Sequence, residues 1–163
     1  MIIMGVDPGT ATTGYGIINC VGSAFRLIEC GIIDTNCKAS MCCRLQTIYN
    51  DLMKIINFYQ PEHYAVEEIF FSKNTRTAIP VGQARGVALL AGANAGLEVF
   101  EYKPLQVKMA VTGYGGADKG QVQYMVKTLL SLGSIPKPDD AADALALAIC
   151  HAYNNGFNKK VSL

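Results

Sequence analysis

Met1-Ile-Ile-Met-Gly-Val-Asp-Pro-Gly-Thr10 places an acid at the end of a short apolar strand, directly before a turn that contains proline and glycine. A second strand, Gly14-Tyr-Gly-Ile-Ile-Asn-Cys20, follows at once, and the two runs predict a β-hairpin. An acid at the tip of a buried strand is costly unless something cationic meets it. We therefore expect a metal ion, or a substrate phosphate, beside Asp7.

The chain has 163 residues, half of them hydrophobic, and a net charge of +1. This length suits a single compact domain, which we place at residues 1–154, followed by a disordered tail at 155–163. The first residues have no basic segment or cleavage pattern, so we expect no signal peptide and a cytoplasmic protein. The six cysteines form no Cys-x-x-Cys pair, which favours reduced thiols over a disulfide framework or a zinc site.

The rest of the chain alternates between strand and helix patterns. Strands are predicted at 24–34, 63–71 and 97–102, and helices from Ser40 to before Pro61, over 77–95, around 122–130 and from 139 to 150. This order predicts an α/β fold with a five-stranded mixed sheet flanked by helices. The first three strands would form an antiparallel meander, and strands 1, 4 and 5 would be parallel.

Further acids occur at two places. Asp140 and Asp143 are three residues apart, so on a helix they project from one face. Taken alone, acids at a helix start are more often caps or partners of the helix dipole. Glu67 and Glu68 end a strand that should lie parallel to the Asp7 strand, where open α/β sheets bind ligands. Strand alternation cannot choose between these two glutamates, because a central parallel strand is buried on both faces.

Carboxylates that converge from two strand ends and a helix suit a particular chemistry. They can hold two Mg²⁺ ions about 4 Å apart, and such a pair stabilises the attacking and leaving oxygens in phosphodiester hydrolysis. A net charge of +1 allows nucleic acid as the substrate but does not by itself indicate it.

Six motifs occur in order along the chain. They are Gly5-Val-Asp-Pro-Gly-Thr10 with Gly14-Tyr-Gly16, Ala65-Val-Glu-Glu-Ile-Phe70, Gly82-Gln-Ala-Arg-Gly86, Gln106-Val-Lys108, Ala117-Asp-Lys119 with Gln121-Val-Gln123, and Asp140-Ala-Ala-Asp-Ala-Leu-Ala146. Together they resemble the motifs of bacterial RuvC-type Holliday junction resolvases, which belong to the RNase H-like, retroviral-integrase superfamily. The resemblance extends from Ile2 to about Ala152.

The resemblance implies roles for individual residues. It makes Glu67, rather than Glu68, an active-site acid, and it leaves Asp139 outside the metal set and free to cap its helix. Phe70 would stack on an unpaired base at the junction centre, although core packing is the alternative from sequence alone. Arg85 could contact DNA or be a structural ion-pair partner. The implied metal ligands are Asp7, Glu67, Asp140 and Asp143, and the implied catalytic lysines are Lys108 and Lys119. Lys73 and Arg76 are further predicted DNA-binding residues, because they flank the loop after Phe70.

The resemblance also implies the reaction. A homodimer would bind four-way DNA junctions and nick two strands of like polarity, using two Mg²⁺ ions per active site, for which Mn²⁺ would substitute. Each nick would leave a 5′-phosphate and a 3′-hydroxyl, as part of homologous recombination and DNA repair. The helix from about Thr77 to Ala95 is our predicted dimer interface, and a branch-migration complex of the RuvA–RuvB type is the implied partner.

Three alternatives remain open from the sequence. The Asp-Pro-Gly-Thr turn also suits actin-like ATPases and sugar kinases, but those proteins need two copies of the sheet domain. A junction-binding module without catalysis would not need four intact acids. A nuclease of ribosomal-RNA processing shares the fold and the first motif, but would not be expected to have the Phe70 loop or both lysines.

Overall fold

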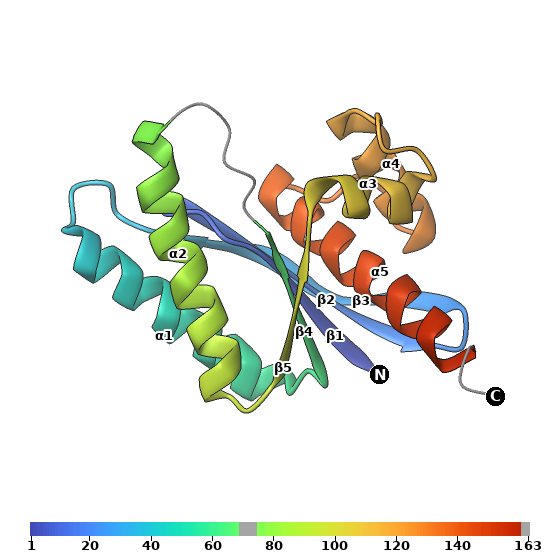
Figure 1. The fold of residues 1–163 in the computed structure, drawn as a ribbon, viewed down its shortest axis with the longest axis horizontal. Coiled ribbons are helices and arrows are strands. Elements are labelled where there is room, and N and C mark those ends of the chain that lie inside the picture. The colour runs from blue at the N-terminus through green and yellow to red at the C-terminus, as the bar shows by residue number, and fades with distance from the viewer. Residues whose placement is uncertain (69–74, 161–163) are drawn as a thin grey trace.

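The computed structural model describes the backbone of residues 1–68 and 75–160, and the side chains of 1–68 and 78–155. These ranges contain five strands and five helices (Figure 1). The strands are β1 Ile2–Asp7, β2 Thr12–Val21, β3 Ala24–Asp34, β4 His63–Glu67 and β5 Glu98–Tyr102. The helices are α1 Met41–Tyr59, α2 Thr75–Asn94, α3 Pro104–Thr112, α4 Lys119–Leu129 and α5 Asp139–Lys160.

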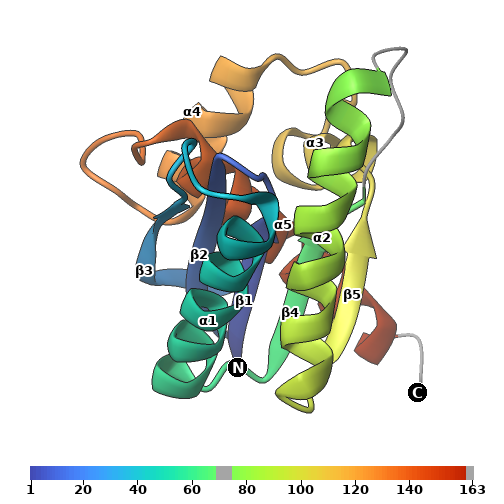
Figure 2. The same ribbon diagram turned by 90° about the vertical axis from the view of Figure 1, so that its left-hand side faces the viewer.

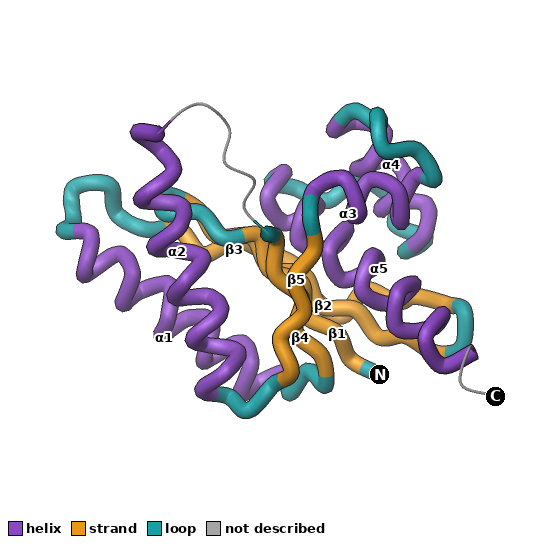
Figure 3. Tube along the Cα trace, viewed as in Figure 1, coloured by secondary structure: helices purple, strands orange, loops and turns teal. Residues whose placement is uncertain are grey.

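The strands form one sheet in the order β3-β2-β1-β4-β5. β1 pairs antiparallel with β2, and β2 with β3, while β1 pairs parallel with β4, and β4 with β5. Figure 3 shows the sheet between two groups of helices, with α1 and α2 on one face and α3, α4 and α5 on the other. The predicted fold class, including the antiparallel meander and the three parallel strands, is confirmed.

Each face of the sheet has its own hydrophobic core. Along β1, Met4 and Val6 point toward α1 and α2, whereas Ile3 packs on the side of α5. Figure 2 shows α1 and α2 lying side by side across their face of the sheet. Side chains that alternate along a strand point to opposite faces, so a strand buried on both sides needs apolar residues at every position. The continuous apolar run at the start of the chain meets this requirement.

The limits of α1 follow from local chemistry. The Ser40 side chain accepts a hydrogen bond from the backbone N–H of Cys43, which caps the first turn. Ile48, Leu52 and Ile56 recur every four residues and are buried against the sheet. Gln60 adopts the left-handed conformation and ends the helix before Pro61. The predicted start and end of this helix are both confirmed.

β4 is shorter than the sequence indicated. The prediction extended it from His63 to Phe71, but the strand ends at Glu67. Its partner β5 ends at Tyr102, which lies opposite Glu67, and Pro104 then begins α3. The Glu68 N–H donates to the carbonyl of Tyr102, the residue at which β5 ends. Within the described residues, β5 therefore offers no further strand residue with which β4 could pair. Residues 69–71 lie outside the described residues.

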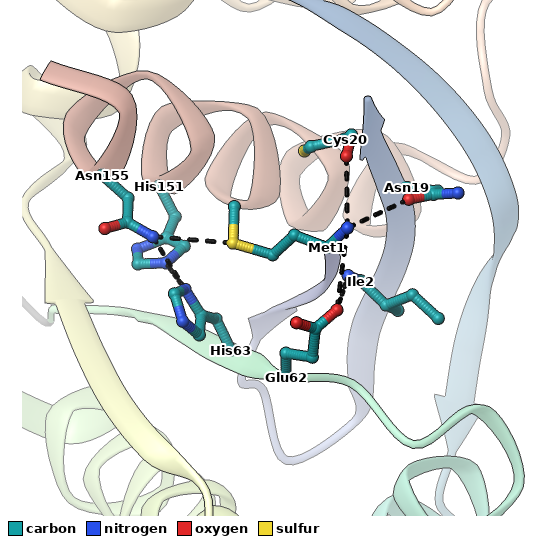
Figure 4. Close-up of polar contacts among 8 residues, drawn as sticks. All are labelled: Met1, Ile2, Asn19, Cys20, Glu62, His63, His151 and Asn155. Atoms are coloured by element: carbon teal, nitrogen blue, oxygen red, sulfur yellow. Dashed lines mark hydrogen bonds and ion pairs between the residues drawn. The ribbon is translucent and has the colours of Figure 1, made fainter. Parts of the chain in front are cut away.

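α5 is longer than the sequence indicated. The sequence led us to expect a disordered tail from residue 155, yet the helix continues to Lys160. Asn155 anchors this part of the helix, because its side-chain amide lies 3.1 Å from His63 Nδ1 and 3.6 Å from Met1 Sδ (Figure 4). For residues 161–163, outside the described range, disorder stays a prediction. Of the helices in residues 1–68 and 75–160, none combines the length and apolarity that a bilayer crossing requires.

A histidine pair links α5 to the start of β4 at His63 and to the end of β5 at Tyr102. His151 Nε2 lies 2.7 Å from His63 Nδ1, and the hydroxyl of Tyr102 lies 2.8 Å from His151 Nδ1. Since the Asn155 amide can only donate to His63 Nδ1, that nitrogen is an acceptor. His151 Nε2–H then donates to His63, and the Tyr102 hydroxyl donates to His151. With the Tyr102 hydroxyl donating to its Nδ1, the ring of His151 is neutral.

The neutral His151 makes stability depend on pH. Burial lowers the pKa of His151 from 6.5 to about 4, and the nearby His63 lowers it too. As the pH falls from 6.5 toward 4, the unfolded chain therefore binds a proton that the folded chain does not. We expect the free energy of unfolding to fall across this interval by roughly 3 kcal/mol at most. Urea unfolding at several pH values should show a steeper loss for the wild type than for His151→Gln, and equal slopes would contradict the assignment.

Candidate active site

Two acids meet at the carboxyl ends of the parallel strands, because β1 and β4 are neighbours in the sheet. The register pairs Val6 with Val66, so Asp7 and Glu67 both follow at the carboxyl ends of their strands. α5 begins over the same edge at Asp139 and lies across β1 and β2. Figure 1 shows the helix running away from this edge across the sheet. Two strand ends and a helix start therefore converge, as the sequence predicted.

Three glycines allow α5 to lie directly on the strands. A Cβ at Gly14 would lie 2.0 Å from the Asp140 carbonyl oxygen, and one at Gly5 would lie 2.1 Å from the Ala144 carbonyl oxygen. A Cβ at Gly16 would approach the Leu145 nitrogen to 2.8 Å. No real side chain tolerates such contacts, so these positions accept only glycine at this helix distance. Because Gly14 pairs with Asp7 in the sheet, the contact places the first turn of α5 beside Asp7.

Asp7 and Glu67 form a pair of partly buried carboxyl groups that influence each other. Burial raises the pKa of Asp7 well above its ordinary value, and the charge of Glu67, with those of Asp143 and Asp140, raises it further. Burial also raises the pKa of Glu67, although a hydrogen bond with Asp7 works in the opposite direction. Two carboxyl groups in this arrangement share a proton unless a cation neutralises them. The pair therefore favours binding of a cation.

Lys119, the first residue of α4, lies beside the acids of α5. Its Nζ is 3.0 Å from Asp143 Oδ2 and 3.6 Å from Asp139 Oδ2. Burial lowers the pKa of Lys119, but the hydrogen bond and charge of Asp143 outweigh it and the net shift is upward. Burial raises the pKa of Asp143 in spite of Lys119. Lys119 therefore stays charged, and it compensates only part of the effect of burial on the pKa of Asp143.

A pocket of about 210 Å³ opens between the sheet edge, α3, α4 and α5. Four of the predicted catalytic residues line it, namely Glu67, Lys108, Lys119 and Asp143. Its apolar wall is formed by Pro104, Val107, Val122, Ala146 and Leu147. A larger pocket of about 490 Å³ lies between the end of α3 and α4, and the only charged residue that lines it is Asp118. The smaller pocket is the candidate site, because predicted acids and lysines converge there.

The four-carboxylate metal set is not formed. Within residues 1–68 and 78–155, no three His, Cys, Asp or Glu side chains are close enough to hold an ion. The contact between Asp143 and Lys119 supplies one reason, because it engages an acid of the set. The donor set nevertheless fits a hard divalent cation, since it offers only carboxylate oxygens and the negative charge of the partly buried Asp7 and Glu67 is not neutralised. Asp7, Glu67, Asp140 and Asp143 are the residues that would hold it.

Several other predicted residues can be placed. Asp139 does not act as a free helix cap, because its carboxylate contacts Lys119 and lies 3.2 Å from Lys137 Nζ. Arg85 is a structural partner, since its guanidinium pairs with Glu101 and its Nε donates to the Glu67 carbonyl. Phe70 and Lys73 lie outside the described residues. Arg76 lies in the first turn of α2, where the side chains are outside the described range.

No sequence pattern indicated the two residues that hold the turn after Asp7. Arg44 on α1 and Thr35 after β3 both bond to the carbonyl oxygen of Thr10. No spacing or motif marks them, because α1 meets this turn only once the sheet has formed. A polar residue facing the sheet from the first turn of α1 is the one pattern that could have drawn attention to Arg44.

The mixed sheet, with buried acids at the carboxyl ends of its parallel strands, defines an RNase H-like fold of the kind found in junction resolvases. The chain belongs to the RuvC family, since residues 3–151 match the model of "Crossover junction endodeoxyribonuclease RuvC". A protein with this name from Pelotomaculum thermopropionicum is 61% identical over 163 residues, covering 100% of this chain and 99% of the relative. One from Desulforamulus reducens is 60% identical over 152 residues, covering 93% of each.

Solved structures agree with this assignment. Thermus thermophilus RuvC in complex with a Holliday junction substrate superimposes with a TM-score of 0.92 at 34% identity, covering 97% of this chain and 96% of that one. The fowlpox virus Holliday junction resolvase has a TM-score of 0.57 at 17% identity, covering 95% of this chain and 99% of the viral one. At that identity the viral protein supports the fold alone.

Gly14→Ala tests whether the approach of α5 positions the site. The added methyl group would overlap the Asp140 carbonyl, so the helix start has to move away from Asp7. We expect a loss of stability of roughly 1–3 kcal/mol, measured by chemical denaturation. The control is Gly133→Ala, because a Cβ at Gly133 meets nothing within 4 Å. Equal stability of the two variants would show that α5 is not held at this distance.

Proposed function

We propose that this protein is a structure-selective endonuclease that resolves four-way DNA junctions by paired, symmetric nicks. Membership of the RuvC family supports this function, as does the junction complex of the Thermus relative. The observation that carries it is the pocket at the carboxyl ends of the parallel strands, where Glu67 and Asp143 face Lys108 and Lys119 next to the partly buried Asp7. The reaction is metal-dependent hydrolysis, and its proposed products are a 5′-phosphate and a 3′-hydroxyl in homologous recombination and DNA repair.

The acids provide the proposed cation site. Asp7, Glu67, Asp140 and Asp143 would hold two Mg²⁺ ions, with Mn²⁺ as a substitute. When bound, such ions supply Lewis-acid activation of the scissile phosphate and of the attacking water. The protein itself provides a rigid frame for the ligands, since two of the acids end paired strands and the other two begin a helix packed directly on those strands. The shared proton between Asp7 and Glu67 would be released when positive charge arrives.

The lysines contribute to substrate binding and charge stabilisation. Lys119 is 54% exposed, and an ammonium group has three donors, so it can bond to a phosphate oxygen while it keeps a carboxylate partner. Lys108 lies on α3 across the same pocket. A cation near the scissile phosphate lowers the energy of the more highly charged transition state. Phe70 stays a proposed DNA contact on the strength of family resemblance, and Lys73 and Arg76 stay proposed contacts because they follow Phe70 closely in the sequence.

A homodimer fits the two-fold symmetry of a four-way junction, and the outer face of α2 is the proposed interface. Ile79 is 71% exposed and Leu90 is 51% exposed on this helix. A Cβ at Gly82 or Gly86 would meet nothing within 4 Å, so the helix presents a low surface between these apolar side chains. A second copy could approach closely there. A branch-migration complex of the RuvA–RuvB type is a further proposed partner, on resemblance alone.

Substitution of single acids tests the active site. Asp7→Asn and Glu67→Gln should each bind a synthetic four-way junction normally but cleave it at least roughly 100-fold more slowly, because each loses a charged metal ligand. Titration calorimetry with Mg²⁺ should show weakened binding in the same variants. Single-turnover cleavage, gel-shift binding and calorimetry measure the three effects separately.

The matched control is Glu68→Gln, which changes the neighbouring glutamate that does not line the pocket. It should cleave at the wild-type rate, and a loss equal to that of Glu67→Gln would refute the assignment of Glu67. The wild type should prefer a four-way DNA junction over structured RNA of similar size. Preference for RNA would indicate a ribosomal-RNA nuclease, and binding without cleavage in Mg²⁺ would indicate a silent module.

Gly86→Leu tests the dimer interface. The new side chain points into open space in a single chain, so the melting temperature should stay near that of the wild type. A close helix contact with a second copy would be blocked, and sedimentation should detect a monomer where the wild type is a dimer. Gly133→Leu adds the same side chain to an open position away from α2 and should stay dimeric. A dimeric Gly86→Leu protein would move the interface elsewhere.

A further inference from the structure

Arg44 holds the turn that follows Asp7. Its Nη2 donates to the Thr10 carbonyl at 2.9 Å, and its Nε donates to the Thr35 hydroxyl at 2.8 Å. The Thr35 hydroxyl in turn donates to the same Thr10 carbonyl. One guanidinium and one hydroxyl thus converge on a backbone oxygen three residues beyond Asp7. The three partners come from α1, from the segment after β3 and from the turn between β1 and β2.

The rest of this turn is held in the same way. The Thr35 backbone N–H donates to the Ala11 carbonyl at 3.0 Å, and the Thr13 hydroxyl donates to the Gly9 carbonyl at 2.8 Å. Pro8 is buried and has a fixed φ, so it adds little freedom. Bonds from other segments therefore fix the carbonyls of residues 9–11. The turn is rigid on the side of Asp7 that the sheet does not reach.

The contacts of Arg44 indicate a structural use of its charge. Two of its nitrogens are engaged in a fork by Thr10 and Thr35, and no ion pair within residues 1–68 and 78–155 includes it. Its side chain is half-buried against the turn. A planar guanidinium can bond to two acceptors at fixed angles, whereas a lysine ammonium cannot reproduce that geometry. The site therefore requires the shape of arginine as well as its charge.

We propose that Arg44, together with Thr35, is a positioning residue that fixes the Pro8–Ala11 turn and thereby the carboxylate of Asp7. This inference rests on the proposed function, in which Asp7 is a metal ligand. Within the sheet, Asp7 is held by its pairing with Gly14 on β2. The turn that follows Asp7 is held by the Arg44 fork. A looser turn leaves Asp7 in more than one orientation, which weakens metal binding without changing the DNA surface.

Arg44→Lys and Thr35→Val test the proposal, with Arg26→Lys as the control at the far end of the sheet, where Arg26 pairs with Asn19. We expect each test variant to bind Mg²⁺ about 10- to 100-fold more weakly in calorimetry without DNA, as for other residues that orient a ligand. The Mg²⁺ concentration for half-maximal junction cleavage should rise in parallel. Junction affinity without metal should change less than about twofold. The double variant should lose little more than either single one, because both act through Thr10.

Three results would overturn the proposal. Wild-type Mg²⁺ binding by Arg44→Lys would show that only charge matters at this position. Weaker junction binding with an unchanged Mg²⁺ requirement would make Arg44 a phosphate contact. A lower melting temperature with unchanged Mg²⁺ binding would leave only a role in stability. Failure of the proposed function is distinguishable from all three, because in that case the wild type itself would not cleave the junction.

Discussion

The close approach of α5 to β1 and β2 is the constraint on which the rest of the structure depends. Glycines at 5, 14 and 16 leave no side chain between the strands and the helix backbone. The alanines of α5 complete the contact from the helix side, and Ala141, Ala144 and Ala148 are buried. A helix at this distance can place short aspartate side chains beside the end of a strand. With larger residues at the contact, the same acids would stand too far from Asp7.

This geometry collects more negative charge than the local structure neutralises. Burial and the charge of Glu67 raise the pKa of Asp7, and Asp143 pairs with Lys119, which also contacts Asp139. Such a cluster is expensive in the folded protein, because burial disfavours each ionised carboxylate. Active sites commonly contain such destabilising clusters, because a site with excess negative charge binds cations strongly. The raised pKa of Asp7 is thus a consequence of the same packing that brings the acids together.

The two faces of the sheet have separate tasks that meet at Asp7. The face covered by α3, α4 and α5 contributes the pocket, with two lysines and two of the acids. The face covered by α1 and α2 contributes the Arg44 fork and the exposed surface of α2. Asp7 stands between them because β1 is the central strand. Changes on either face can therefore reach the same carboxylate through different contacts.

The sequence by itself determined the five strands, four of the helices and their order. The strand run before Asp7, the Ser40 cap, the periodic Leu and Ile residues of α1 and the acids at 140 and 143 each act over a few residues, and local patterns of that kind are visible in a sequence. Local patterns could not choose between Glu67 and Glu68; family resemblance favoured Glu67, and the fold turns Glu67 toward Asp7. They assigned Asp139 to a cap, whereas its partners are lysines of other segments.

Only the tertiary structure decided the remaining features. β4 stops at Glu67 because β5 has no further residue to pair with it, and α5 continues because Asn155 meets His63 and Met1. The Arg44 fork joins residues 34 positions apart along the chain. Each of these depends on which segments become neighbours after folding. Local propensity fixes what a segment becomes, but contacts between distant segments fix where it ends and what its side chains meet.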